Sequence, residues 1–346
     1  MAYSSERKTV VPWNDIRNRW VRCAGERNKA EVVKKYFNTF ATKHPGYTFI
    51  IAKKFNDLYD VCITAQQCSA IKTHLEREFG LSGYLEKAMS MEVPWRDCTE
   101  KSFRNAQDFR EYREHTLVSK NRPVIRAKHA EARLHYNKVK DVFTKSAFQI
   151  LCFDIEVYEH NRSIMLEIGY VISRFTAGVR YLGFGSQGEK PDVTLVTKRH
   201  LIIRENLHYK NGDGVPDNRH GFRFGSSETL SLADAVRRFR EDVRECDYIL
   251  GHSVKHDDAY LRNIGVDLSE LGKEMFDTQV VQTYKESLKE SEKYFMRGLS
   301  HLLKEYKVNY EESDLHNAGC DAFYTMMVFL RQMEYSAEEV NTIIAS

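Results

Sequence analysis

The chain has 346 residues, of which 42% are hydrophobic and 12% aromatic, enough for a packed core and too apolar for a wholly disordered protein. Lysine and arginine number 52 against 49 aspartates and glutamates, a net charge of only +3. This charge is unevenly spread: residues 1–150 sum to about +11 and residues 151–346 to about −8, which suggests a polyanionic partner for the first half and a separate role for the acids of the second.

The sequence also indicates a location. No segment reaches the roughly 18 consecutive apolar residues of a membrane span, and the first residues lack the apolar run of a secretory signal. The seven cysteines are odd in number and include no Cys-x-x-Cys pair, which is typical of free thiols in a reducing compartment. We therefore expect a cytoplasmic or nuclear protein that is neither secreted nor bound in a membrane.

Residues 1–100 predict a small α+β domain whose role the sequence leaves open. Apolar side chains recur at helical spacing from Asn28 to Phe40. Two strand-like runs follow at 47–55 and 58–64, and a helix over 66–79 ends at Gly80.

Residues 101–146 predict a basic helical connector. Residues 101–145 hold twelve lysines and arginines against five acids, and the pattern is helical from Pro123 to Phe143. The segment is either a solvated connecting helix or a surface that follows the phosphates of a nucleic acid. The candidate contacts are Arg122, Arg126, Lys128, Arg133, Lys138 and Lys140.

Residues 147–346 predict a mixed α/β sheet flanked by helices. Apolar strands are expected at 147–157, 164–175 and 192–204, followed by a loop rich in Gly, Asn and Asp over 205–226. A helix with Leu232 and Phe239 on its apolar face and a short strand at 248–250 come next. Further helices are expected at 257–263, 298–306, 321–332 and 337–345.

The first strand of this region carries two carboxylates. Asp154 and Glu156 lie two residues apart, so in a strand they share one face, while Phe153, Ile155 and Val157 share the other. Two acids on a largely apolar strand are costly unless a cation neutralises them. We favour a metal site over the alternative of an edge strand with a solvated face.

A second acidic position follows the strand at 248–250. The segment Gly251-His-Ser-Val-Lys-His-Asp257 passes through a short turn into a helix that opens near Asp257. An acid there is either a further ligand or a simple partner of the helix dipole.

The third position is His316 with Asp321. Asn317-Ala-Gly leads from the histidine into an apolar helix that carries Asp321 in its first turn. This setting lets the acid face the sheet while the histidine stays on a loop.

These motifs occur in the order Asp-x-Glu, Asp after a Gly-His turn, and His-x4-Asp. With Phe153-Asp-Ile-Glu-Val-Tyr-Glu159, Leu166-Glu-Ile-Gly169 and His316-Asn-Ala-Gly-Cys-Asp-Ala322, residues 147–333 resemble the DEDDh 3′→5′ exonucleases of the ribonuclease H-like superfamily. Within them, the chain is most similar to a fungal-type subgroup that includes an argonaute-interacting exonuclease.

The resemblance implies a ribonuclease H-like sheet and a phosphodiesterase centre. Asp154, Glu156, Asp257 and Asp321 match the four metal-binding acids, and His316 matches the general base. Four carboxylates without soft ligands favour two Mg²⁺ or Mn²⁺ ions. The expected activity is hydrolysis of RNA, with DNA as the alternative, from a 3′ end to nucleoside 5′-monophosphates. The rival hypothesis is a catalytically idle nucleic-acid-binding or scaffolding protein.

Two parts of the chain stay open to more than one interpretation. The loop 205–226 is either a solvated insertion or a mobile segment that closes over a bound strand through Lys210, Arg219 and Arg223, with Tyr209, Phe222 or Phe224 stacking on bases. Residues 1–146 either bind nucleic acid or dock a protein partner.

Overall fold

The computed structural model describes residues 7–24, 26–83, 85, 90–177 and 190–345. The chain forms two compact units, Met1–Lys128 and His129–Ser346. The boundary between them falls inside helix α5, Val118–Val142. None of the described helices is long and apolar enough to cross a membrane.

The first unit contains a five-stranded antiparallel sheet in the order β4-β1-β3-β2-β5. Its strands are β1 (Arg7–Pro12), β2 (Thr48–Lys53), β3 (Tyr59–Thr64), β4 (Met91–Pro94) and β5 (Cys98–Ser102). Its helices are α1 (Trp13–Cys23), α2 (Arg27–Lys43), α3 (Ala65–Phe79) and α4 (Ala106–Glu111). The sequence predicted α2, α3 and the two central strands.

Aromatic side chains hold these helices to one face of the sheet. Trp13 lies at the centre, with ring centroids 4.6 Å from Phe37 and 5.2 Å from Phe49. Such clustered rings bury much apolar area and stabilise a small domain strongly. A π-helical segment, Tyr112–Leu117, joins α4 to α5.

The second unit contains a six-stranded mixed sheet in the order β11-β10-β6-β7-β8-β9. Its strands are β6 (Ala147–Tyr158), β7 (Asn161–Thr176), β8 (Asp192–Ile203), β9 (Ser227–Leu230), β10 (Tyr248–Gly251) and β11 (Glu274–Asp277). Strands β6, β7 and β8 pair antiparallel, whereas β10 is parallel to β6 and β11 to β10. This is the expected ribonuclease H-like sheet, so the predicted fold class is confirmed.

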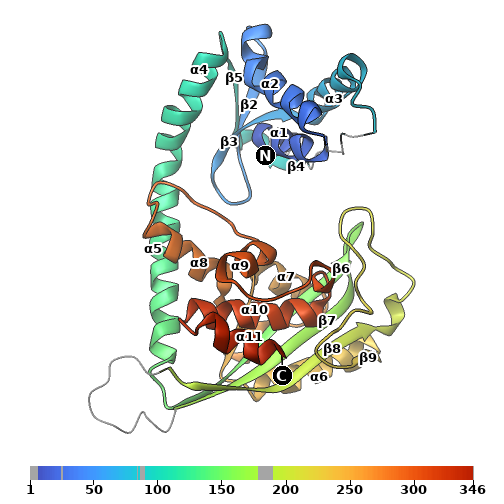
Figure 1. Cartoon of the computed structure of the whole chain (residues 1–346), viewed down its shortest axis with the longest axis vertical. Helices are drawn as coiled ribbons and strands as arrows, with labels where there is room; N and C mark the ends of the chain where they lie inside the picture. The colour runs from blue at the N-terminus through green and yellow to red at the C-terminus, as the bar shows by residue number, and fades with distance from the viewer. Residues whose placement is uncertain (1–6, 25, 84, 86–89, 178–189, 346) are drawn as a thin grey trace, which may run out of the picture. The chain divides into compact units, whose positions relative to one another are not determined.

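Helices cover both faces of the second sheet (Figure 1). They are α6 (Leu232–Arg244), α7 (Lys255–Asn263), α8 (Thr278–Ser287), α9 (Leu299–Tyr306), α10 (Ala318–Gln332) and α11 (Ala337–Ala345). Leu151 and Phe153 pack with α6 and α7 on one face, while Ile150 and Cys152 pack with α10 on the other. Helix α10 is buried along almost its whole length.

Candidate active site

Strand β6 directs Asp154 and Glu156 to the face that α10 covers. Their neighbours Phe153 and Ile155 are buried on the opposite face, 0% and 5% exposed. Because side chains alternate along a strand, the two acids must lie on the same face as Ile150 and Cys152. The local sequence therefore fixes which way both carboxylates point.

A glycine in the next strand brings the third carboxylate to them. Gly169 of β7 is paired with Asp154, and a Cβ atom at Gly169 would lie 2.0 Å from the carbonyl carbon of Ala318. The first residue of α10 thus rests directly on the sheet backbone, which only glycine permits. Asp321, one turn further along α10, is held beside β6 as a result.

Asp277 supports the turn that leads to the fourth carboxylate, that of Asp257. Its Oδ1 accepts a hydrogen bond from the Ser253 amide at 2.9 Å, and its Oδ2 accepts one from the Val254 amide at 3.0 Å. These bonds hold the turn that leads from β10 into α7, where Ser253 has a left-handed φ of 62°. Asp257 follows in the first turn of α7 and is only 6% exposed.

The four carboxylates repel one another. Burial and the charge of Glu167 raise the pKa of Asp154 to about 7. The pKa values of Glu156, Asp257 and Asp321 are also raised, mainly by burial and then by the charge of Asp154. A cluster of unpaired buried acids is stable only if protons or cations compensate its charge.

One oxygen of this cluster is fully buried and unpaired among the described residues. Asp321 Oδ1 is buried and, among the described residues, accepts no hydrogen bond, whereas Oδ2 accepts the His316 amide at 3.0 Å. Buried polar atoms are almost always satisfied, so an unpaired carboxylate oxygen in an all-oxygen cluster fits a bound divalent cation.

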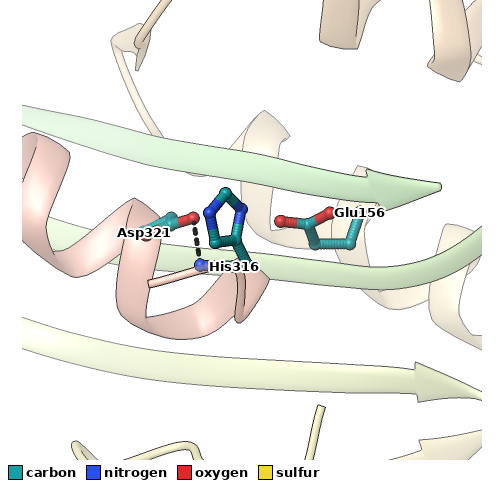
Figure 2. Close-up of side chains that lie close together, drawn as sticks. All are labelled: Glu156, His316 and Asp321. Atoms are coloured by element: carbon teal, nitrogen blue, oxygen red, sulfur yellow. Dashed lines mark hydrogen bonds between the residues drawn. The ribbon is translucent and has the colours of Figure 1, made fainter. Parts of the chain in front are cut away.

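His316 lies between two of the acids (Figure 2). A ring nitrogen of His316 and carboxylate oxygens of Glu156 and Asp321 lie within 4.8 Å of one another. The residue has a left-handed backbone, with φ of 62°, a conformation that histidine tolerates better than most residues. Burial lowers the pKa of its imidazole, against the charge of Glu312, which raises it. The lowered pKa favours the neutral form of the imidazole, whose free ring nitrogen can accept a proton.

Beneath the acids lies a buried polar network that the sequence analysis missed. Glu167, 2% exposed, is paired with Glu156 across β6 and β7. Its Oε2 lies 2.7 Å from His200 Nε2 and accepts the Ala318 amide at 3.1 Å. In the sequence, Leu166-Glu-Ile-Gly169 carries part of the family resemblance, but no short spacing links Glu167 to His200.

Arg219 belongs to this network and not to the surface. Its side chain is 2% exposed, its Nε lies 3.8 Å from Glu167 Oε1, and it donates to the Tyr209 carbonyl at 2.7 Å. The prediction that Arg219 contacts nucleic acid is therefore corrected, because its charge compensates a buried carboxylate.

The loop 205–226 is anchored at two places along its middle rather than loose. Glu159, at the end of β6, accepts hydrogen bonds from the amides of residues 212–215 at 2.7–3.1 Å, which lowers its pKa to about 2. Further along, Asn218 Nδ2 donates to the Leu315 carbonyl at 2.5 Å, and Asn317 Nδ2 donates back to the Asn218 carbonyl at 3.0 Å. The last two hydrogen bonds involve Leu315 and Asn317, the residues directly before and after His316. The loop therefore supports the histidine.

Of the other side chains of this loop that were predicted to contact nucleic acid, one is exposed and the rest already contact other parts of the protein. Lys210 is exposed. Arg223 forms an ion pair with Asp314 at 3.2 Å. Phe222 is 9% exposed and packs on Gly319, while Phe224 stacks on Phe323 with centroids 3.6 Å apart. Neither ring is presented to a base.

The basic side chains of α5 that were predicted to contact nucleic acid also fall into two groups, those that are paired or half-buried and those that are exposed. Lys138 donates to Glu274 at 2.7 Å, and Lys128 lies 3.9 Å from Asp57. Arg122 is half-buried. Arg126, Arg133 and Lys140 are exposed and lie seven residues apart, which places them on one face of the helix.

Comparison with known proteins assigns most of the second unit to one family. The family model described as DNA polymerase III subunit epsilon-like, C-terminal domain, of the DEDDh type, matches residues 149–332, more than half of the chain. Escherichia coli Exonuclease I in complex with a dA16 oligonucleotide is 16% identical, with a TM-score of 0.33 over 58% of this chain and 43% of that one.

Two fungal relatives are similar at the level of sequence. Good for full DBP5 activity protein 2 of Saccharomyces cerevisiae is 26% identical over 220 residues, 55% of this chain and 36% of the relative. An uncharacterized nucleolar protein of Schizosaccharomyces pombe is 27% identical over 211 residues, 61% of this chain and 76% of the relative. The match thus spans little more than a third of the first relative's length.

Proposed function

The chain belongs to the DNA polymerase III epsilon-like family of DEDDh exonucleases, in the ribonuclease H-like superfamily, and from this premise we propose that it hydrolyses RNA from the 3′ end in a metal-dependent reaction. DNA is the alternative polymer, and nucleoside 5′-monophosphates are the products. The observation that carries the proposal is the set of four mutually repelling carboxylates with an unpaired Asp321 Oδ1 beside His316.

Asp154, Glu156, Asp257 and Asp321 are the residues that would hold two Mg²⁺ or Mn²⁺ ions. Carboxylate oxygens are the ligands these hard cations prefer, and the cluster contains no thiolate. When bound, a pair of such ions stabilises the charge on the attacking and leaving oxygens of an in-line displacement. Among the described residues no ion pair joins a lysine or an arginine to these four acids, whereas the neighbouring acids Asp314 and Asp258 each pair with an arginine.

His316 acts as the general base in this proposal. Its neutral imidazole accepts a proton from the attacking water at a ring nitrogen, and the lowered pKa keeps that nitrogen free near pH 7. The Asp321 carboxylate, the hydrogen bond from Asn218 to the Leu315 carbonyl and the one from Asn317 to the Asn218 carbonyl hold the segment that positions the ring.

The proposal also specifies RNA as the substrate and the nucleus as the location. The name of the S. pombe relative describes a nucleolar protein, which supports both. Exposed basic residues at positions 126, 133 and 140 of α5 supply candidate phosphate contacts.

The test is cleavage of 3′-labelled and 5′-labelled RNA and DNA by the 346-residue chain, with Mg²⁺, Mn²⁺ or EDTA. We expect shortening from the 3′ end that EDTA abolishes and that Asp154→Asn eliminates. Asp258→Asn is the matched control, because Asp258 is one residue from Asp257 and pairs with Arg262 at 2.9 Å; it should retain activity.

Asp154→Asn should also leave the metal-free protein folded, with an equal or higher Tm, since it removes charge repulsion. Wild-type cleavage rates in Asp154→Asn, or no cleavage by the wild-type protein under any condition, would leave the idle scaffold as the better hypothesis.

A further inference from the structure

Helix α5 carries a histidine that contacts the strand end next to the candidate active site. His135 lies outside residues 149–332, the segment that matches the family, but it belongs to the second compact unit, His129–Ser346. Its Nε2 accepts a hydrogen bond from the amide of Asp277 at 3.0 Å. Asp277 is the last residue of β11 and is 5% exposed. The contact therefore joins a helix that precedes the family segment to the residue that supports the turn before Asp257.

Strand β11 lacks a partner on the side where this histidine lies. The order β11-β10-β6-β7-β8-β9 makes β11 an edge strand, and a buried amide without an acceptor is costly. On its inner side β11 pairs with β10, with Asp277 opposite Gly251. The His135 ring supplies the acceptor that a further strand would have given. It also packs edge-on against Phe276, with ring centroids 5.7 Å apart.

Two neighbours of His135 fix α5 to the same unit. Tyr136 stacks on Tyr284 of α8, with ring centroids 4.7 Å apart, so that α5 lies beside α8 (Figure 1). Lys138 donates to Glu274, the first residue of β11, at 2.7 Å. Helix α5 thus runs along the edge strand, with Lys138 at the amino end of β11 and His135 at its carboxyl end.

The hydrogen bond also determines the protonation of the ring. A ring nitrogen that accepts a hydrogen bond carries no proton, so the imidazole of His135 is neutral with its proton on Nδ1. Burial lowers the pKa of His135, although the charges of Asp277 and Glu274 oppose this shift. The buried environment therefore favours the form of the ring that can accept the amide.

Asp277 passes this support on to the turn before α7. Its carboxylate accepts the amides of Ser253 and Val254 at 2.9 and 3.0 Å, and that of Gln279 at 2.8 Å. Ser253 has a left-handed φ of 62°, a conformation that persists in a residue other than glycine only when the surroundings hold it. Because both the amide and the carboxylate of Asp277 are bonded, the turn that leads to Asp257 is held from a fixed point.

We propose that His135 is a positioning residue of the metal centre, which acts through Asp277 and residues 251–254 to hold Asp257 where it can bind a divalent cation; this rests on the proposed function, because it takes Asp257 as a metal ligand. Outer hydrogen-bond partners of metal ligands typically change metal affinity or activity by about 10–100-fold when they are replaced. His135 touches neither the metal nor the substrate, so its replacement should change metal affinity without changing the KM for the strand.

Three substitutions in the 346-residue chain separate the acceptor atom from the ring. His135→Phe keeps an aromatic ring against Phe276 but removes the acceptor nitrogen. His135→Gln restores an acceptor, because its side-chain amide reaches the position of Nε2. Tyr136→Leu is the matched control, since it removes the stack on Tyr284 from the same turn of α5 without touching the Asp277 contact.

Hydrogen exchange in EDTA measures the positioning without metal or cleavage. In His135→Phe we expect exchange about five- to tenfold faster at the amides of Asp277, Ser253 and Val254, the effect of losing about one hydrogen bond. Calorimetric titration with Mn²⁺ should then give a Kd raised by about tenfold. His135→Gln should match the wild-type protein in both measurements. Tyr136→Leu should lower the Tm but leave the Mn²⁺ affinity unchanged.

The outcomes distinguish this proposal from a purely structural role of α5. Unchanged exchange or unchanged Mn²⁺ affinity in His135→Phe would overturn it, and so would a Kd raised equally in Tyr136→Leu, since general destabilisation would then be the cause. Failure of His135→Gln to restore the affinity would show that the acceptor is not what matters. If the wild-type protein neither binds Mn²⁺ nor cleaves a strand, the proposed function itself fails and this proposal with it.

Discussion

His316 combines a left-handed backbone, with φ of 62°, with an amide that donates to Asp321 Oδ2 at 3.0 Å. His316→Ala should lower turnover by about 10²–10⁴-fold, the usual effect of losing a general base. Calorimetry with Mn²⁺ should show nearly unchanged binding, since the four acids remain. His256→Ala, an exposed histidine of α7, is the control and should keep full activity.

The geometry also defines what would contradict this assignment. Glu156, His316 and Asp321 lie close enough to bind one ion together. Loss of Mn²⁺ affinity in His316→Ala, in parallel with the loss of turnover, would make the imidazole a ligand instead of a base.

Glu159 gives a prediction for pH. Its pKa is lowered to about 2 by the amide hydrogen bonds from residues 212–215. A carboxylate whose pKa is lower in the folded than in the unfolded chain stabilises the fold at every pH above its ordinary pKa of about 4.3. This stabilisation is lost as the pH falls from there toward 2. Glu159→Gln should therefore lower the Tm at pH 7, and the difference from wild type should shrink below about pH 4.5.

Thermal unfolding at about pH 7, pH 4 and pH 2.5 measures this difference across the range in which it is lost. Glu205→Gln is a useful comparison, because Glu205 accepts a hydrogen bond from the amide of Leu232 alone, at 3.0 Å. A difference in Tm between wild type and Glu159→Gln that stays constant with pH would show that the ionised carboxylate is not what anchors the loop.

At the scale of elements, the close contact of β7 with α10 determines the site. A Cβ atom at Gly169 would lie 2.0 Å from Ala318, so Gly169→Ala should push α10 from the sheet. We expect destabilisation of about 1–3 kcal/mol, the usual cost of overpacking, and a loss of activity larger than the loss of folded protein. Denaturant unfolding and cleavage assays on the same sample measure both.

Gly298 provides the matched control for this change. A Cβ atom there meets nothing within 4 Å, and its φ of −72° suits any residue. If Gly169→Ala were no more destabilising than Gly298→Ala and equally active, the tight contact would not be what positions Asp321.

Sequence periodicity predicted the three long strands and most helices of the second unit, but not β9, β11 or α8. The helix expected at 337–345 is α11 itself, and strands β6, β7 and β8 lie where apolar runs predicted them. The first unit was harder, because β1, β4 and β5 are short or polar. Their strand character comes from pairing with distant residues, such as Val10 with Thr64, which local patterns do not contain.

Local sequence patterns also predicted some side chains of the site and missed others, because they do not contain contacts between distant residues. The positions of Asp154 and Glu156 on one face follow from strand alternation alone. The Glu167–His200 contact joins residues 33 apart, and the anchoring of the loop by Glu159 joins residues more than 50 apart. Such contacts depend on sheet register, so composition alone led to the expectation of a mobile loop and a surface-exposed Arg219.

At the scale of the whole molecule, α5 is the longest basic element. Replacing Arg126, Arg133 and Lys140 together by Gln should weaken binding of long single strands. The slope of log K against log salt should flatten by up to about 2, since each lost contact contributes about 0.7. Cleavage of a very short oligonucleotide should be unaffected.

Lys138→Gln is the control on the same helix, because the ammonium group of Lys138 is already bonded to Glu274. An unchanged salt dependence in the triple variant would identify the exposed face of α5 as a solvated surface and leave strand binding to other residues.

The boundary between the two units has a practical consequence for dissecting the protein. It falls at His129, within a continuous helix, whereas the first strand of the second unit begins at Ala147. Val139 and Val142 belong to the core beneath α10, and His135 Nε2 accepts the amide of Asp277 at 3.0 Å. A fragment cut at the first strand would thus lose a wall of its core and a support of the turn before Asp257. The second compact unit therefore begins partway along helix α5, and a fragment meant to contain its whole core has to include the helix from His129 onward.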